Sequence, residues 1–97
     1  MARKYFRITD VIQICGVDRE FIVRLEEEKV IHSVPKGREK LYPADQVDRV
    51  RVARLLIEEM GVNLEGAEVA LHMREQMIAM QRQFNQILRL VCERMKE

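Results

Sequence analysis

The side chains that most often carry catalysis or bind metal ions are few and scattered in this chain of 97 residues. Cys15 and Cys92 lie far apart and form no CxxC pair, so we expect two reduced apolar residues rather than a disulfide or a metal site. His32 and His72 have no Cys, His or carboxylate neighbours at metal-ligand spacing. There is no Ser-His-Asp set and no glycine-rich phosphate loop. The sequence therefore predicts no metal, no cofactor and no enzymatic activity.

The chemistry that remains is ion pairing, and it is concentrated between residues 18 and 29. This segment, "DREFIVRLEEEK", has five acidic and three basic residues, a balance of −2, in a chain whose net charge is +1. Such a run is often only a solvated helix end, but a basic protein surface would be attracted to it. The candidate partner-binding residues are Asp18, Glu20, Glu27 and Glu28.

A second candidate set is basic and would suit double-stranded DNA instead. Phosphates attract Lys and Arg and repel carboxylates. The alternative DNA-binding residues are Arg19, Arg24, Lys36, Arg38 and Lys40. The acidic balance of residues 18–29 argues against DNA, whereas the basic residues between 36 and 40 argue weakly for it.

Two short helices are predicted to position the acidic segment. Thr9 is expected to cap the first helix, and Gly16 to end it. Asp18 is expected to cap the second, which should end near Lys29 and keep its charged residues on the outer side. Its core-facing residues recur at helical spacing: Phe21, Ile22 and Leu25.

A small β-hairpin, or wing, is predicted next. "VIHSV" (30–34) is typical of a strand, "PKGR" (35–38) of a tight turn and "EKLY" (39–42) of a returning strand. Pro43 suits the first turn of a third helix, which Gly61 should end. The apolar residues of that helix recur every three or four positions: Val47, Val50, Ala53, Ile57 and Met60.

Asn63 is expected to cap a fourth helix that nothing interrupts between Leu64 and Lys96, apart from Gly66 in its first turn. Such a helix would be about 50 Å long and would have to leave the globule. From Ala70 onward its apolar residues alternate at spacings of three and four, as in a coiled coil. The predicted dimer seam consists of Met73, Met77, Met80, Phe84, Ile87 and Val91.

Two other interpretations of this seam stay open. It could pack on the third helix of its own chain, or its methionines could form a pliable surface for another protein. A second row widens the apolar face beyond a two-stranded seam, which would suit a bundle of helices: Ile78, Leu88 and Met95.

The order of elements resembles the MerR superfamily, which has a winged helix-turn-helix domain and a dimerising C-terminal helix. The matching stretches are "YFRITDVIQICGVDREFIVRLEEEKVI" and "GREKLYPADQVDRVRVARLLIEEMGVNLEGAEVAL". The resemblance implies a mainly α fold, with residues 1–62 as a MerR-like winged helix-turn-helix domain with a small β-hairpin wing. It also implies that residues 63–97 form a long C-terminal dimerisation helix, so we expect a homodimer.

The second helix differs in sequence from the same helix in the DNA-binding members of the superfamily. Those members have an arginine, two tyrosines and a glutamate where this chain has Val23, Arg24, Leu25 and Glu26. Lys29 stands where they have a glycine. The arginine and both aromatic phosphate contacts are therefore replaced, and Arg24 is only a partial substitute.

A branch of the superfamily, the CbpM-type chaperone modulators, is more similar. The likeness consists of a total length of about a hundred residues, the "MGVNLEGAEVALHM" junction and the lack of an effector domain after it. This resemblance implies a non-enzymatic protein that binds the J-domain of a DnaJ-like co-chaperone and inhibits it. A MerR-family DNA-binding transcriptional regulator is the alternative. No signal-like or membrane-spanning run is present, so we expect a cytoplasmic protein.

Overall fold

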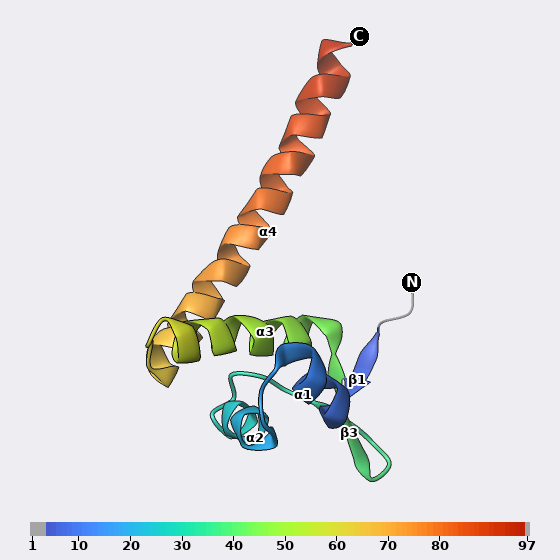
Figure 1. The fold of residues 1–97 in the computed structure, drawn as a ribbon. Coiled ribbons are helices and arrows are strands. Elements are labelled where there is room, and N and C mark those ends of the chain that lie inside the picture. The colour runs from blue at the N-terminus through green and yellow to red at the C-terminus, as the bar shows by residue number, and fades with distance from the viewer. Residues whose placement is uncertain (1–3, 97) are drawn as a thin grey trace.

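The computed structural model describes residues 4–96, which form four α-helices, one π-helical turn and a three-stranded sheet. The elements are β1 (Tyr5–Arg7), α1 (Ile8–Cys15), α2 (Arg19–Glu27), β2 (Val34–Lys36), β3 (Glu39–Pro43), α3 (Ala44–Arg54), the π-helical turn η1 (Leu55–Glu59) and α4 (Leu64–Met95). Residues 4–62, here called the head, gather α1 and α2 beside α3, and α4 rises away from the end of α3 (Figure 1). The predicted mainly α fold with a β wing and a long last helix is confirmed.

Local signals explain most of the helix boundaries. Asp18 accepts a hydrogen bond from the backbone N–H of Phe21 at 2.8 Å, as an N-cap should. Gly16 ends α1 with φ +67°, a conformation that glycine adopts without strain. The predicted cap at Thr9 is wrong, because α1 begins at Ile8. The backbone N–H of Arg7 instead donates to the Asp10 carboxylate at 3.2 Å.

The exit from α2 is tighter than the sequence predicts. The helix ends at Glu27, and Lys29 has φ +60°, the left-handed conformation in which a side chain is strained. Val30 and Ile31, expected in a strand, are instead completely buried in the connection that follows. Their apolar, β-branched side chains contribute to the core rather than to the wing.

The wing is a hairpin with an additional third strand. β2 and β3 pair antiparallel around a turn at residues 37–38, with Lys36 opposite Glu39. β1 pairs with the other edge of β3, placing Tyr5 opposite Pro43, which gives the order β1-β3-β2. Strand β1 was not predicted, because three residues before a helix carry too short a pattern to indicate a strand.

The core of the head is aliphatic, apart from Tyr42, and draws on every helix. Its fully buried large side chains are Tyr42, Ile22, Leu25, Ile31, Leu71, Val11, Val30 and Val50. Leu71 belongs to α4, so the first turns of the long helix are part of this core. Burying an aliphatic side chain of this size stabilises a fold by roughly 1.5–3 kcal/mol.

Helix α4 begins where Asn63 accepts a hydrogen bond from the backbone N–H of Gly66 at 2.8 Å, as its predicted capping role requires. The predicted third helix is α3 extended by η1, and Gly61 (φ +72°) follows it. The long helix makes the described chain 57 Å in its greatest dimension. Among residues 4–96, no helix is both long and apolar enough to span a membrane.

Candidate functional site

Helix α2 is held by its apolar side and presents its opposite side to solvent. Ile22 and Leu25 are buried to 1% exposure or less. Because successive residues turn by about 100° around a helix, Glu20, Val23 and Glu27 then point away from this core. All three are exposed, Val23 to 43%. The outermost surface of α2 therefore carries two carboxylates, with the apolar Val23 on one side of them and the exposed Arg24 on the other.

The four acidic candidates are all at the surface. Asp18, Glu20, Glu27 and Glu28 are exposed, and none of the ion pairs found among residues 4–96 involves them. Asp18 is already engaged as the N-cap of α2. Glu20 and Glu27 of α2 and Glu28, directly after the helix, therefore carry free negative charge around the exposed Arg24, and we call these three glutamates the acidic ridge.

Glu26 does not belong to that outer side, contrary to the sequence prediction. Its carboxylate accepts hydrogen bonds from the Tyr42 hydroxyl and from the Lys40 ammonium, both at 2.8 Å. It also accepts one from the Ser33 hydroxyl at 3.3 Å. Glu26 thus ties α2 to strand β3 and to the connection between them, which fixes the wing beside the helix.

These contacts set the ionisation of the half-buried Glu26 and the buried Tyr42. Burial alone would raise the pKa of Glu26, but the hydrogen bonds from Lys40 and Tyr42 outweigh it and lower that pKa. Burial and the neighbouring carboxylate raise the pKa of the Tyr42 hydroxyl, while the positive charge of Arg19 acts in the opposite direction. At neutral pH Glu26 is therefore charged and Tyr42 is a neutral donor.

A hollow of about 650 Å³ lies between α2, the start of α1 and the wing. We call it the wing hollow. Its lining residues are Arg7, Ile8, Thr9, Arg19, Val23, Glu26, Glu27, Arg38, Glu39, Lys40 and Tyr42. The structure brings together three of the five DNA-binding candidates here, Arg19, Arg38 and Lys40, but not Arg24. Lys36 lines a smaller neighbouring hollow beside Tyr5 and Leu41.

The cysteines and histidines form no site in the described part of the chain. Among residues 4–96 no group of three or more His, Cys, Asp or Glu side chains is placed to hold a metal ion. The buried Cys15 thiol donates to the Val47 carbonyl oxygen at 3.6 Å, and burial raises its pKa. The exposed His32 is held by its backbone N–H, which donates to the buried Gln46 amide oxygen at 3.0 Å.

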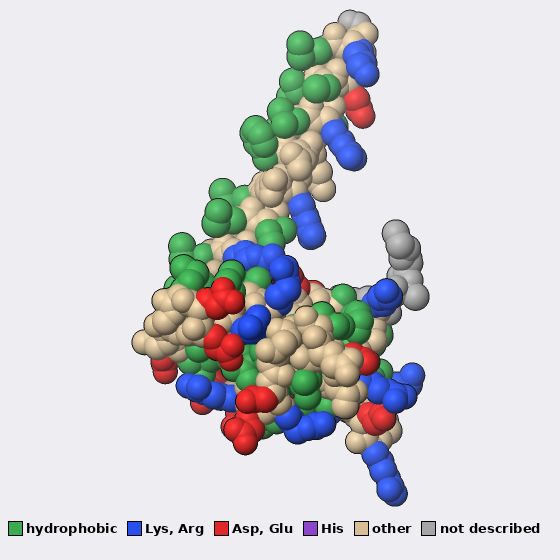
Figure 2. All heavy atoms as spheres, viewed as in Figure 1, with side chains coloured by type: hydrophobic (Ala, Val, Ile, Leu, Met, Phe, Trp, Pro, Cys, Tyr) green, Lys and Arg blue, Asp and Glu red, His purple; other side chains and the backbone are tan. Residues whose placement is uncertain are grey.

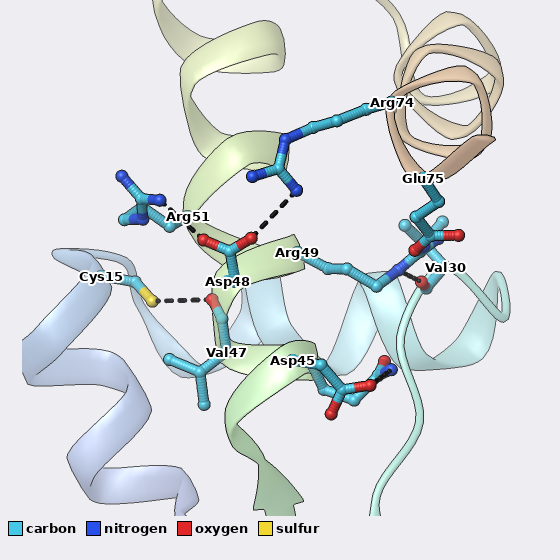
Figure 3. A network of polar contacts seen from close by, with 10 residues as sticks. Cys15, Val30, Asp45, Val47, Asp48, Arg49, Arg51, Arg74 and Glu75 are labelled. Carbon is cyan, nitrogen blue, oxygen red and sulfur yellow. Dashed lines mark hydrogen bonds and ion pairs between the residues drawn. The ribbon is translucent and has the colours of Figure 1, made fainter. Parts of the chain in front are cut away.

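A polar network that the sequence analysis missed joins α3 to α4 (Figure 3). Asp48 pairs with Arg51 at 2.6 Å on its own helix and with Arg74 of α4 at 2.9 Å. Arg49 donates from Nε to the Val30 carbonyl oxygen at 2.8 Å, and its other end pairs with Glu75 of α4. The sequence did not predict these partners, because the spacing of charges along one helix does not show what another helix brings near.

Beyond Glu75, α4 leaves the head with its predicted seam uncovered. Five of its residues are more than half exposed, and Val91 is 48% exposed. The five are Met73, Met77, Met80, Phe84 and Ile87. Figure 2 shows hydrophobic side chains along one side of the protruding helix and mostly basic side chains along the other. The buried residues of α4 lie on another side of the helix, namely Leu64, Ala67 and Leu71. The seam therefore does not pack on the third helix of its own chain.

Two helices joined by a turn, a β-hairpin wing and a long terminal helix together define a winged helix-turn-helix protein. The model of one family, described as MerR HTH family regulatory protein, matches residues 6–89. This chain therefore belongs to that family. Among curated proteins no match is found.

Proposed function

We propose that this protein is a non-enzymatic chaperone modulator, which binds the J-domain of a DnaJ-like co-chaperone through α2 and inhibits it. The observation that carries the proposal is the acidic ridge. Glu20, Glu27 and Glu28 are exposed and take part in none of the ion pairs within residues 4–96. The first two lie on the helix that a winged helix-turn-helix protein uses for recognition, and Glu28 follows it directly.

Charge complementarity supports a protein partner over DNA. A J-domain of the kind expected from the CbpM-type resemblance presents a basic helix, which carboxylates attract and steer. A DNA duplex would instead be repelled by the same three groups, at the place where the recognition helix must approach its phosphates. Occupying the basic helix of the J-domain would inhibit it, because that surface would no longer be free for its chaperone partner.

The alternative function is that of a MerR-family DNA-binding transcriptional regulator. Membership of the family and the clustering of Arg19, Arg38 and Lys40 around one hollow favour it. Against it, Lys40 is already engaged by Glu26, and Glu27 lines the same hollow. DNA binding would therefore depend on the other four basic candidates and not on Lys40. These four are Arg19, Arg24, Lys36 and Arg38.

Reversing the acidic ridge distinguishes the two functions by the direction of its effect. The variant Glu20→Lys/Glu27→Lys/Glu28→Lys should weaken binding to an isolated J-domain by about tenfold or more, measured by titration calorimetry. The matched control is Glu59→Lys/Glu65→Lys/Glu93→Lys, which makes the same charge change on exposed residues elsewhere. The same ridge reversal should tighten DNA binding if the protein is a regulator. Unchanged J-domain affinity would remove the basis of the modulator proposal.

We also propose a homodimer formed through α4, with residues 1–62 as the winged domain and residues 63–97 as the dimerisation segment. The uncovered seam supports it, since an apolar stripe of this length on a soluble helix usually has a helical partner. Replacing Phe84 and Ile87 by Asp should give a monomer in analytical ultracentrifugation. A wild-type chain that sediments as a monomer at high micromolar concentration would contradict the dimer.

A cytoplasmic location fits this proposal. Cys15 and Cys92 are both free thiols, as expected of a protein in a reducing compartment.

A further inference from the structure

The wing hollow contains two kinds of cation, those already paired and those available to a partner. Arg7 pairs with Glu39 at 3.6 Å, and Lys40 pairs with Glu26 at 2.8 Å. No ion pair among residues 4–96 involves Arg19 or Arg38, although both line the hollow. The internal pairs cancel, which leaves the two guanidinium groups and the Glu27 carboxylate as the unpaired charges that line the hollow.

The two available arginines come from different elements and are placed by different contacts. Arg19 is the first residue of α2, directly after the capping Asp18. Its positive charge acts to lower the pKa of Tyr42, which also lines the hollow. Arg38 is in the turn of the wing, between β2 and β3. Because Glu26 ties β3 to α2, the two sides of the hollow are held together before any partner arrives.

The remaining lining is suited to a side chain of a protein. Ile8 and Val23 contribute apolar surface, and the Thr9 hydroxyl contributes a small polar group. Glu27 belongs both to the acidic ridge and to the lining of the hollow. A partner that fits must therefore present cations to the ridge and an anion to the hollow within a short distance of each other.

We propose that the wing hollow binds an acidic side chain of the partner protein, on a segment whose neighbouring basic side chains pair with the acidic ridge. This rests on the proposed function and deepens it, because it defines the partner as a basic surface that carries one carboxylate. Arg19 and Arg38 are the groups that receive this carboxylate, with the planar guanidinium geometry that matches its two oxygens. Val23 and Ile8 contact the carbon atoms that carry it.

A carboxylate fits this charge pattern better than a row of phosphates. Each DNA strand carries one negative charge per nucleotide, so a strand crossing the hollow would also meet the carboxylates of Glu27 and the ridge. A single carboxylate satisfies the two arginines and leaves Glu20 and Glu27 for cations of the partner. The mixed surface thus selects a protein with both signs of charge over a uniform polyanion.

The test removes the two arginines without changing the acidic ridge. The variant Arg19→Gln/Arg38→Gln keeps side-chain bulk and changes only exposed residues, so its fold should be retained. Titration calorimetry with an isolated J-domain should show an affinity about tenfold lower than that of the natural sequence. The matched control Arg82→Gln/Arg89→Gln, two exposed residues on the distal part of α4, should stay within about twofold.

The possible outcomes separate this inference from the proposed function. If the ridge reversal weakens J-domain binding and Arg19→Gln/Arg38→Gln does not, the hollow takes no carboxylate, while the modulator function stands. If neither variant changes the affinity, both proposals are wrong. If Arg19→Gln/Arg38→Gln leaves J-domain binding unchanged but weakens binding to duplex DNA, the hollow is a phosphate site and the inference is overturned.

Discussion

The two parts of α4 lie in the same helix but in different surroundings. The proximal part, residues 64–75, contacts α3, buries Leu64, Ala67 and Leu71, and is paired with α3 through Arg74 and Glu75. In the distal part, residues 76–95, almost every side chain is exposed. One continuous helix is therefore held by neighbouring residues in its proximal part, whereas none of the described residues holds its distal part.

The two parts differ because they use different sides of the helix. Leu71 and Phe84 are 13 residues apart, so their side chains point in directions that differ by about 140° around the axis. A second helix can therefore cover the seam without displacing the head from its own side. An unsupported helix of some twenty residues is only marginally stable in water, so the distal part depends on such a partner more than the proximal part does.

The largest expected difference between the two parts is in the effect of losing one leucine. Leu71→Ala should lower the free energy of unfolding by about 2–5 kcal/mol, because Leu71 is 1% exposed and its removal leaves a cavity in the head. Leu90→Ala, in the distal part, removes the same atoms from a side chain that is 62% exposed. This variant should change the free energy of unfolding by less than about 0.5 kcal/mol. Urea unfolding of both variants measures the contrast, and equal losses would show that the two parts are equally buried.

The next effect concerns Arg49, which connects three elements. Arg49→Met keeps most of the side-chain volume but leaves the Val30 carbonyl and the Glu75 carboxylate without this donor. Since the Arg49 side chain is only 15% exposed, we expect a loss of about 1–3 kcal/mol in unfolding free energy. The control Arg54→Met breaks the more exposed pair with Glu58 and should cost less than about 1 kcal/mol. A smaller loss for Arg49→Met than for Arg54→Met would mean that the Arg49 contacts do not hold α4.

Much of the fold could be predicted from local patterns in the sequence. The caps at Asp18 and Asn63 and the turn at Gly16 were found because each depends on one residue and its immediate neighbours. The long helix was found because nothing interrupts it. The predicted first strand of the wing was placed too early, since Val30 and Ile31 are equally apolar in a strand or in a buried connection.

The candidate site could be predicted only in part, because its residues are distinguished by distant partners. By sequence alone Glu26 looks like Glu27 and Glu28, and only the wing, 14 and 16 residues later, shows that Lys40 and Tyr42 bind it. The same is true of Arg38 and Lys40, of which only the second is paired with Glu26. The wing hollow, formed by three separate segments, had no sequence signal at all.

A smaller effect is expected at Gly66, in the first turn of the proximal part. Replacing glycine by alanine inside an open helix usually stabilises it by about 1 kcal/mol. Here an added Cβ would lie 2.9 Å from Val62 Cγ1 and 3.0 Å from the Asn63 oxygen that caps the helix. We therefore expect Gly66→Ala to destabilise the protein by about 1 kcal/mol, similar to Asn63→Ala. Thermal unfolding of the two variants compares them, and a stabilised Gly66→Ala would contradict the tight cap.

The smallest effect is a pH dependence that should distinguish the proximal part from the distal part. Hydrogen bonding to Arg51, opposed by partial burial and aided by Arg74, lowers the pKa of Asp48 below its ordinary value of 3.8. The contribution of Asp48 to stability is therefore present above pH 3.8, and is lost as the pH falls through the lower pKa of the folded state. Because its side chain is 35% exposed, we expect this contribution to be below about 1 kcal/mol. Asp48→Asn should reduce the loss of unfolding free energy between pH 5 and pH 2, whereas Glu93→Gln, on the distal part, should not. An identical acid dependence in Asp48→Asn and the natural sequence would show that the pair with Arg74 does not help to fix α4 on the head.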